Sequence, residues 1–166
     1  EMPGAFRRAC QLETARLRQR GLAVWSLNNE ILQPALITLL LWGALMIWLG
    51  PEILPFLLVA SFWANFQLTA ANYVEHYGLL RRRVDGRYEP VREEHSWNAD
   101  FAVSNWVLFN LQLHSDHHAH MNRPFEQLRT VVDAPQLPAG YPTMVVLALL
   151  PPLWFAVMDS RLPARA

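Results

Sequence analysis

Two long stretches of the chain contain no charged residue, and they constrain the fold more than any other feature. Residues 31–51 and 53–74 lack Asp, Glu, Lys and Arg, and only Glu52 separates them. About twenty apolar residues in a helix are enough to cross the roughly 30 Å hydrocarbon core of a bilayer. The sequence therefore predicts a membrane protein in which two spanning helices form a hairpin.

The distribution of arginine predicts how this hairpin is oriented. All basic residues are arginines, because the 166-residue chain contains no lysine. Several arginines precede the first apolar stretch and several follow the second, whereas the short link between the stretches has none. Positively charged flanks usually remain in the cytoplasm. Both ends of the hairpin are therefore expected on the cytoplasmic side.

These patterns divide the chain into three expected parts. Residues 1–33 should contain a charged cytoplasmic helix, since residues 5–20 have helix-forming composition. Residues 34–79 should form the transmembrane hairpin, and residues 80–166 a cytoplasmic part. The predicted fold class is mainly α, an integral membrane helical hairpin followed by a cytoplasmic helical C-terminal part. The single cysteine, Cys10, excludes an internal disulfide.

The cytoplasmic part contains signals for several local elements. An Asp85-Gly86 pair in a polar segment predicts a short β-hairpin. Residues 96–122 have helical spacing of apolar residues and are expected to form one helix capped by Ser96. Residues 144–158 are apolar but interrupted by two prolines, and this run is short for crossing a membrane. It is expected to lie buried or at the membrane interface.

Histidine is concentrated in one place. Four of the six histidines lie within LQLHSDHHAH, residues 111–120. In a helix, His114, His117 and His118 project within an arc of about 100°. Three protonated rings would repel one another, and three buried neutral rings would each need partners for two nitrogens. A metal ion resolves both difficulties, so the pattern predicts a metal site, with His120 pointing away from it.

One helix cannot complete a coordination sphere, so further residues are needed. His76, at the end of the second apolar stretch, is the first candidate, and His95 is a weaker one. Glu75 and Asp116 are expected to accept the outer N–H of ligating rings as second-shell carboxylates. The polar end of this stretch is equally compatible with residues that simply emerge into the interface. Without a thiolate, zinc, iron, copper and nickel all remain possible.

Two motifs carry a resemblance to a known family. The octapeptide NYVEHYGL (residues 72–79), together with LQLHSDHHA (residues 111–119), resembles the membrane-bound non-heme diiron alkane monooxygenases. EHSWN (residues 94–98) and DAPQLPAGYPTM (residues 133–144) also look like sequence of this family. The HxxHH box alone is less specific, because fatty-acid desaturases and related hydroxylases share it.

The resemblance implies an activity and a site. Carried over by motif, His76, His114, His117 and His118 would be ligands of two iron ions in a centre that faces the cytoplasm. The implied reaction is hydroxylation of the terminal methyl of medium-chain n-alkanes to 1-alkanols with O2, using electrons from rubredoxin. The implied location is the bacterial inner membrane, in a multi-pass protein surrounded by membrane lipid. No nucleic acid partner is expected.

The family pattern is only partly present. Two further histidine motifs, of the forms HExxHK and EHxxGHH, do not occur in the chain. We therefore expect a C-terminal fragment with the last two of six membrane helices, and we expect it to be inactive when isolated. Two alternatives stay open: a related histidine-box oxygenase, such as a fatty-acid desaturase or xylene-type monooxygenase, and an inactive membrane fragment.

The arginine-rich segment LRRRVDGR (residues 80–87) is a candidate surface for an acidic partner. Complementary charge would favour docking of rubredoxin there. The same arginines could instead anchor the preceding helix at anionic lipid headgroups.

Overall fold

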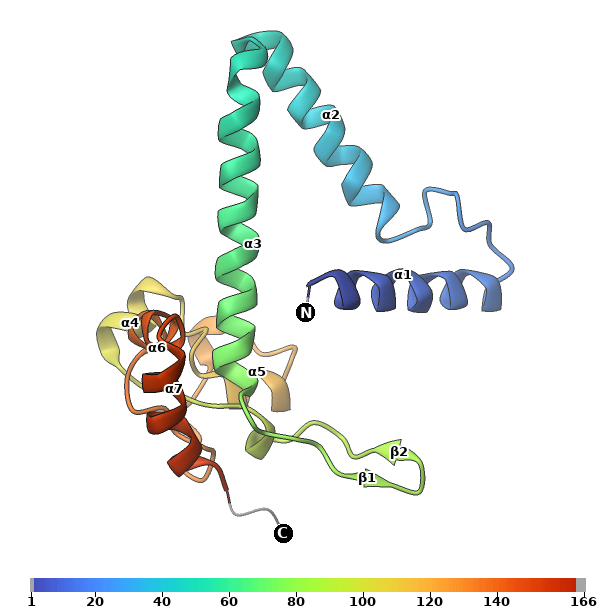
Figure 1. Cartoon of the computed structure of the whole chain (residues 1–166). Coiled ribbons are helices and arrows are strands. Elements are labelled where there is room, and N and C mark those ends of the chain that lie inside the picture. Colours follow the sequence, from blue (N-terminus) through green and yellow to red (C-terminus); the bar gives the residue numbers. More distant parts are fainter. Residues whose placement is uncertain (1, 164–166) are drawn as a thin grey trace. The chain divides into compact units, whose positions relative to one another are not determined.

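The computed structural model describes residues 2–163 and is mainly helical. The chain divides into two compact units, Glu1–Phe66 and Gln67–Ala166, and the division falls inside one long helix, α3 (Leu54–His76). Figure 1 labels the elements along the chain.

The first unit contains the elements predicted from the charge-free stretches. Helix α1 (Met2–Gln19) comes first, then α2 (Leu32–Leu49), a 3-10 turn (Pro51–Ile53) and the first part of α3. No residue of α2 is buried. Of the helices within residues 2–163, two are long and apolar enough to cross a membrane, Leu32–Leu49 and Pro51–His76. The predicted pair of membrane helices is confirmed at this level.

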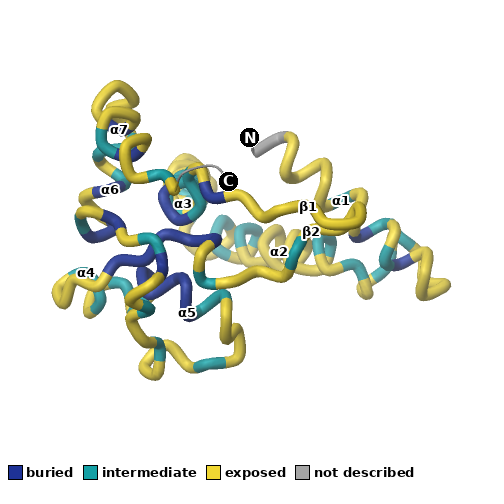
Figure 2. The backbone as a smooth tube through the Cα atoms, turned by 90° about the horizontal axis from the view of Figure 1, so that it is seen from below, coloured by how far each residue is buried: buried dark blue, intermediate teal, exposed yellow. Residues whose placement is uncertain are grey.

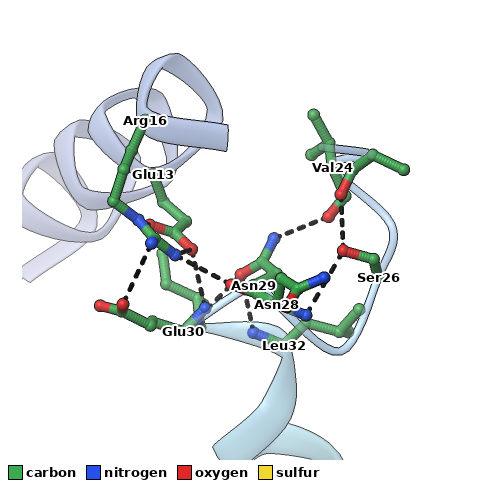
Figure 3. Close-up of polar contacts among 10 residues, drawn as sticks. Glu13, Arg16, Val24, Ser26, Asn28, Asn29, Glu30 and Leu32 are labelled. Carbon is green, nitrogen blue, oxygen red and sulfur yellow. Dashed lines mark hydrogen bonds and ion pairs between the residues drawn. The ribbon is translucent and has the colours of Figure 1, made fainter. Parts of the chain in front are cut away.

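A polar network organises the connection between α1 and α2 (Figure 3). Arg16 donates two hydrogen bonds of 2.6 Å to the carboxylate of Glu13, which also accepts the Glu30 backbone N–H at 2.7 Å. The Asn29 side chain accepts the backbone N–H groups of Ile31 and Leu32. These bonds satisfy N–H groups that have no partner inside a helix at its start, so α2 begins two residues before Pro34.

The second unit contains the predicted β-hairpin. Strands β1 (Arg83–Val84) and β2 (Arg87–Tyr88) are antiparallel, with Arg83 opposite Tyr88 and Val84 opposite Arg87. Asp85 and Gly86 both have positive φ, 50° and 79°. Positive φ at both central residues is the requirement of a type I′ turn. The expected Asp-Gly hairpin is confirmed.

The single helix predicted over residues 96–122 is wrong. The segment contains two short helices, α4 (Ala102–Val107) and α5 (His114–Ala119). Phe109 and Asn110 have φ of 51° and 59°. Left-handed residues interrupt a right-handed helix, so the apolar spacing that suggested one helix spans a turn.

The predicted cap at Ser96 is also wrong. Ser96 is fully buried and lies before α4, whose N-cap position is occupied by Phe101. The buried Gln112 side chain stabilises the turn after α4, since it donates to the carbonyl of Phe101 and to the side chain of Asn105. The start of α4 therefore has no side-chain cap, and the Gln112 bonds hold the following turn against α4.

The last apolar run forms two short helices, α6 (Tyr141–Ala148) and α7 (Pro151–Met158), that pack beside the end of α3. Only one face of this pair is buried, through Tyr141, Met144, Trp154 and Met158, and much of the rest is exposed. The expectation of a buried run is met in part, and a place at the membrane interface stays a prediction. The core of the unit combines it with the end of α3 and with the segment before α4. Figure 2 shows that buried stretches of this unit gather at the end of α3 and along α5 and α6. The remaining 3-10 turns are Glu93–His95, Phe125–Gln127 and Asp159–Arg161.

Candidate metal centre

His76 is the last residue of α3, and its ring is oriented by a backbone carbonyl. The Nδ1 atom of His76 lies 3.2 Å from the carbonyl oxygen of His95. A carbonyl oxygen only accepts hydrogen bonds, so Nδ1 is the protonated nitrogen in this contact. The Nε2 atom of His76 is left with its lone pair available for a metal ion.

Helix α5 brings two further imidazoles to the ring of His76. The ring centroid of His76 lies 5.2 Å from that of His114 and 5.2 Å from that of His118. The ring centroids of His114 and His118 are 4.4 Å apart. One ring nitrogen from each of the three residues lies within 4.8 Å of the others. The i, i+4 spacing within α5 places His114 and His118 on one side of the helix. Residues 38 or more positions apart therefore meet at one point.

The other two histidines of the sequence cluster, His117 in α5 and His120 directly after it, lie outside this trio. The ring of His117 is 5.9 Å from His114 and 5.8 Å from His118, next to the trio but outside the group with the closest nitrogens. His120 is half-exposed and bonds through Nδ1 to Asp116 at 2.9 Å. The structure thus separates His120 from the cluster.

Three buried nitrogens in the cluster have no hydrogen-bond partner among the described residues: both ring nitrogens of His114, and Nε2 of His118. Burial, followed by repulsion from the neighbouring imidazoles, lowers the pKa of His114 to about 3. The same causes lower the pKa of His118. Neutral imidazoles with unpaired lone pairs are the form that binds metal ions, so these residues fit a metal.

Glu75 is buried next to His114. Its carboxylate is buried, and Oε2 is 3.5 Å from Nε2 of His114. Ligating histidines commonly share their outer N–H with such a carboxylate, which fixes ring orientation. Glu75 is therefore placed where a supporting carboxylate would be, in contact with one of the three rings.

Asp116 bonds to other residues. Its buried carboxylate accepts from Arg123 at 2.5 Å, from the backbone N–H of Arg129 at 2.9 Å and from His120. Burial by itself raises the pKa of Asp116, but the bonds from Arg129 and Arg123 outweigh it and hold this pKa below its usual value. Asp116 therefore ties α5 to the loop that follows it.

His95 belongs to a second group of possible ligands, with Glu89 and Glu94. The Nδ1 atom of His95 lies 2.9 Å from the backbone nitrogen of Arg92, which can only donate. Nε2 then carries the proton and donates to Glu89 at 3.1 Å. Both ring nitrogens are used, so the bonding favours a structural role for the His95 side chain.

The segment between the hairpin and α4 contributes to the site in a way that sequence reasoning missed. Residues 95–98 are all buried, and their backbone contacts both α3 and α5. In the sequence, only the EHSWN motif marks this segment, through its resemblance to the family and not through any predicted contact. The role of a polar segment whose backbone carbonyls are buried can be recognised only when the residues that donate to those carbonyls are known.

Chemically, three imidazoles converging from two elements can hold one side of a metal centre. A coordination sphere of four to six ligands has room for more than these three, whichever first-row metal binds. The cluster lies at the end of α3, the helix long and apolar enough to cross a membrane.

Comparisons with known proteins show what the chain is similar to. The family model described as "Fatty acid desaturase" matches residues 4–148. The chain is 51% identical to an alkane 1-monooxygenase of Pseudomonas putida and 49% identical to one of Alcanivorax borkumensis, over 97% of this chain in each comparison. It is 32% identical, over 93% of its length, to the hydroxylase component of a xylene/toluene monooxygenase of Pseudomonas putida. The chain spans 40% of the length of the two alkane 1-monooxygenases.

Proposed function

We propose that this chain, which belongs to the fatty acid desaturase family, contributes the C-terminal part of an enzyme that hydroxylates the terminal methyl of medium-chain n-alkanes. The observation that carries the proposal is the convergence of His76, His114 and His118, with buried nitrogens that lack partners. The two alkane 1-monooxygenases that are about half identical supply the substrate class.

The metal site that we propose holds two iron ions. His76, His114, His117 and His118 would be ligands, and Glu75 would orient His114 through its outer nitrogen. Bound iron would supply the redox chemistry by which O2, two electrons and two protons convert a C–H bond to C–OH, with the second oxygen atom released as water. These four histidines supply only part of the ligands for two metals, so other segments of the full-length enzyme complete the centre.

The residues of this chain would act by positioning and by excluding water. The buried core next to the end of α3, which includes Val74 and Trp97, would keep water from that side of the site. An alkane partitions into lipid, so a site at the end of a membrane helix can receive it from the bilayer. We propose that this end faces the cytoplasm at the bacterial inner membrane, because arginines flank both membrane helices.

Rubredoxin is the electron donor that we propose, and the β-hairpin is a candidate docking surface. The exposed strands carry Arg83 and Arg87, and Arg81 and Arg82 precede them. Lipid anchoring is the competing role for these arginines. Replacing Arg81, Arg82 and Arg83 by Gln in the full-length enzyme tests the choice. Slower electron transfer that depends less on salt than in the unsubstituted enzyme supports docking, whereas unchanged transfer with poor membrane insertion supports anchoring.

A second substrate class has specific support. The 32% identity to a xylene/toluene monooxygenase component means that an aromatic methyl group is the main competing substrate. Fatty-acid desaturation is a further alternative, from the family description. Membranes containing the full-length enzyme should be given octane, xylene and an acyl substrate in turn. Formation of 1-octanol at the highest rate supports the proposal, and preferred turnover of xylene or of acyl chains contradicts it.

Substitutions in the histidine cluster test the metal site. Replacing His118 by Ala in the full-length enzyme should abolish alkane oxidation and lower the iron content per chain. His120→Ala is the matched control, because His120 lies in the same sequence cluster but bonds to Asp116. Equal iron content in the two variants would contradict the assigned ligand. We expect the isolated 166-residue chain to show no turnover.

A further inference from the structure

The buried segment of residues 95–97, here called the strap, connects the two elements that carry the candidate ligands. Its three successive backbone carbonyls accept from three different elements. The carbonyl of His95 faces Nδ1 of His76 at 3.2 Å, that of Ser96 accepts the Ser115 hydroxyl at 3.1 Å, and that of Trp97 accepts the Tyr141 hydroxyl at 3.2 Å. The strap therefore contacts α3, α5 and α6 through consecutive residues.

Trp97 fastens the strap to the end of α3 on both sides of His76. Its backbone N–H donates to the carbonyl of Glu75 at 2.8 Å, and its indole N–H donates to the carbonyl of Tyr77 at 2.7 Å. Trp97 is only 1% exposed. The two carbonyls belong to the residues immediately before and after His76, so these bonds define the position from which its ring projects.

Ser115 connects the strap to α5 through one hydrogen bond, from its hydroxyl to the carbonyl of Ser96. Ser115 is fully buried and lies between His114 and His118 in sequence. Among the hydrogen bonds of residues 2–163, no backbone bond joins α3 directly to α5. Apart from the side-chain contacts of Glu75 and His76 with α5, the hydrogen bonds that hold α3 near α5 therefore run through a third segment.

We propose that the strap is the positioning element of the metal centre, and that Ser115 and Trp97 are its positioning residues. They touch no candidate ligand nitrogen and act through the backbone to which they bond. Small displacements of a metal ligand are costly, since supporting residues around metal sites typically alter metal affinity by about 10- to 100-fold. This inference rests on the proposed function, because it requires that the cluster binds a metal.

Two serines provide a matched test. Ser115→Ala removes the hydroxyl that bonds to the strap. Ser96→Ala removes a hydroxyl that is equally buried but has no hydrogen-bond partner among the described residues. In the full-length enzyme, Ser115→Ala should weaken Fe(II) binding by about 10-fold, measured by competition with a chelator. It should also change the visible absorption of Co(II) bound in place of iron, while Ser96→Ala should alter neither.

Trp97→Phe supplies a second variant, since it removes the indole N–H but keeps an aromatic ring in the core. Trp154→Phe is its control, because Trp154 is the other tryptophan that is 1% exposed and packs in the same core. Thermal unfolding of the metal-free proteins separates a general loss of stability from a change at the metal. Trp97→Phe should weaken metal binding more than Trp154→Phe at similar unfolding temperature.

The possible results separate this inference from the proposed function. If the unsubstituted enzyme binds no iron, the proposed metal centre is wrong. If it binds iron and the two serine variants have equal Fe(II) affinity and equal Co(II) spectra, the strap is not a positioning element, although the metal centre stands. If Trp97→Phe fails to accumulate, the serine pair decides, because each serine variant loses a single oxygen atom.

Discussion

Asp116 should stabilise the loop after α5 more than it supports the metal. Its carboxylate, with a side chain 4% exposed, accepts from Arg123, from the Arg129 backbone and from His120. Hydrogen bonds to a buried charge contribute about 1.5–3 kcal/mol each. The Arg123 side chain is 26% exposed and the His120 side chain is 48% exposed. Solvent therefore reduces the net contribution of these two bonds to stability. The net loss in Asp116→Ala should therefore be about 2–3 kcal/mol.

Hydrogen exchange measures this loss locally. A cost of about 2–3 kcal/mol corresponds to a roughly 30- to 150-fold larger opening constant. Backbone amides of residues 117–129 in the metal-free, full-length protein should exchange faster by that factor in Asp116→Ala. Asp133→Ala, at an exposed position, serves as the control. Unchanged exchange together with lost iron affinity would refute the reasoning and would return Asp116 to the supporting role that the sequence suggested.

Three further predictions concern other parts of the chain. The hydrogen bond from Arg16 lowers the pKa of Glu13 from 4.5 to about 2; the stabilisation is therefore complete above pH 4.5 and lost as the pH falls towards 2. Protection of the Glu30 amide, relative to its intrinsic exchange rate at each pH, should follow this pH dependence and should be lost at all pH values in Glu13→Ala. Tyr141→Phe removes the bond to Trp97 and should lower the free energy of unfolding by about 0.5–1.5 kcal/mol in denaturant titrations. Gly140→Ala would place a methyl group against the Ser104 side chain and should destabilise by about 1–3 kcal/mol, with Gly43→Ala, in open space, as control.

The two long apolar helices could be predicted because their signal is local. A charge-free stretch of sufficient length specifies a spanning helix wherever it packs, since the bilayer requires every backbone group to bond within the segment. The Asp85-Gly86 turn was predictable for a similar reason, because the type I′ geometry depends on the two residues that adopt it.

The helix over residues 96–122 was predicted incorrectly because its signal was ambiguous. Apolar residues recur at helical spacing on both sides of Phe109 and Asn110, yet these two residues adopt left-handed conformations. The Gln112 side chain stabilises the resulting turn by bonding to Phe101 and Asn105. Such bonds depend on tertiary packing, and a periodicity argument includes no information about them.

The prediction that His114 and His118 share one side of a helix does not depend on the long helix, because it concerns only a few residues. His114 and His118 need only one helical turn to lie on the same side, and α5 provides it. Asp116 was expected to bond to a ligating histidine, because it lies next to the candidate ligands in sequence. In the structure it bonds to Arg123, Arg129 and His120 instead. Arg123 and Arg129 come from a loop whose path the sequence did not indicate.

By itself, the sequence determined which segments can cross a membrane and which residue types can bind a metal, because both follow from composition and short-range spacing. The tertiary structure decided that His76 meets His114 and His118, that His120 does not, and that residues 95–97 connect the two elements. The physical reason is that contacts between distant segments depend on which hydrogen bonds the buried backbone groups of those segments form. That pairing is settled only when the whole unit packs.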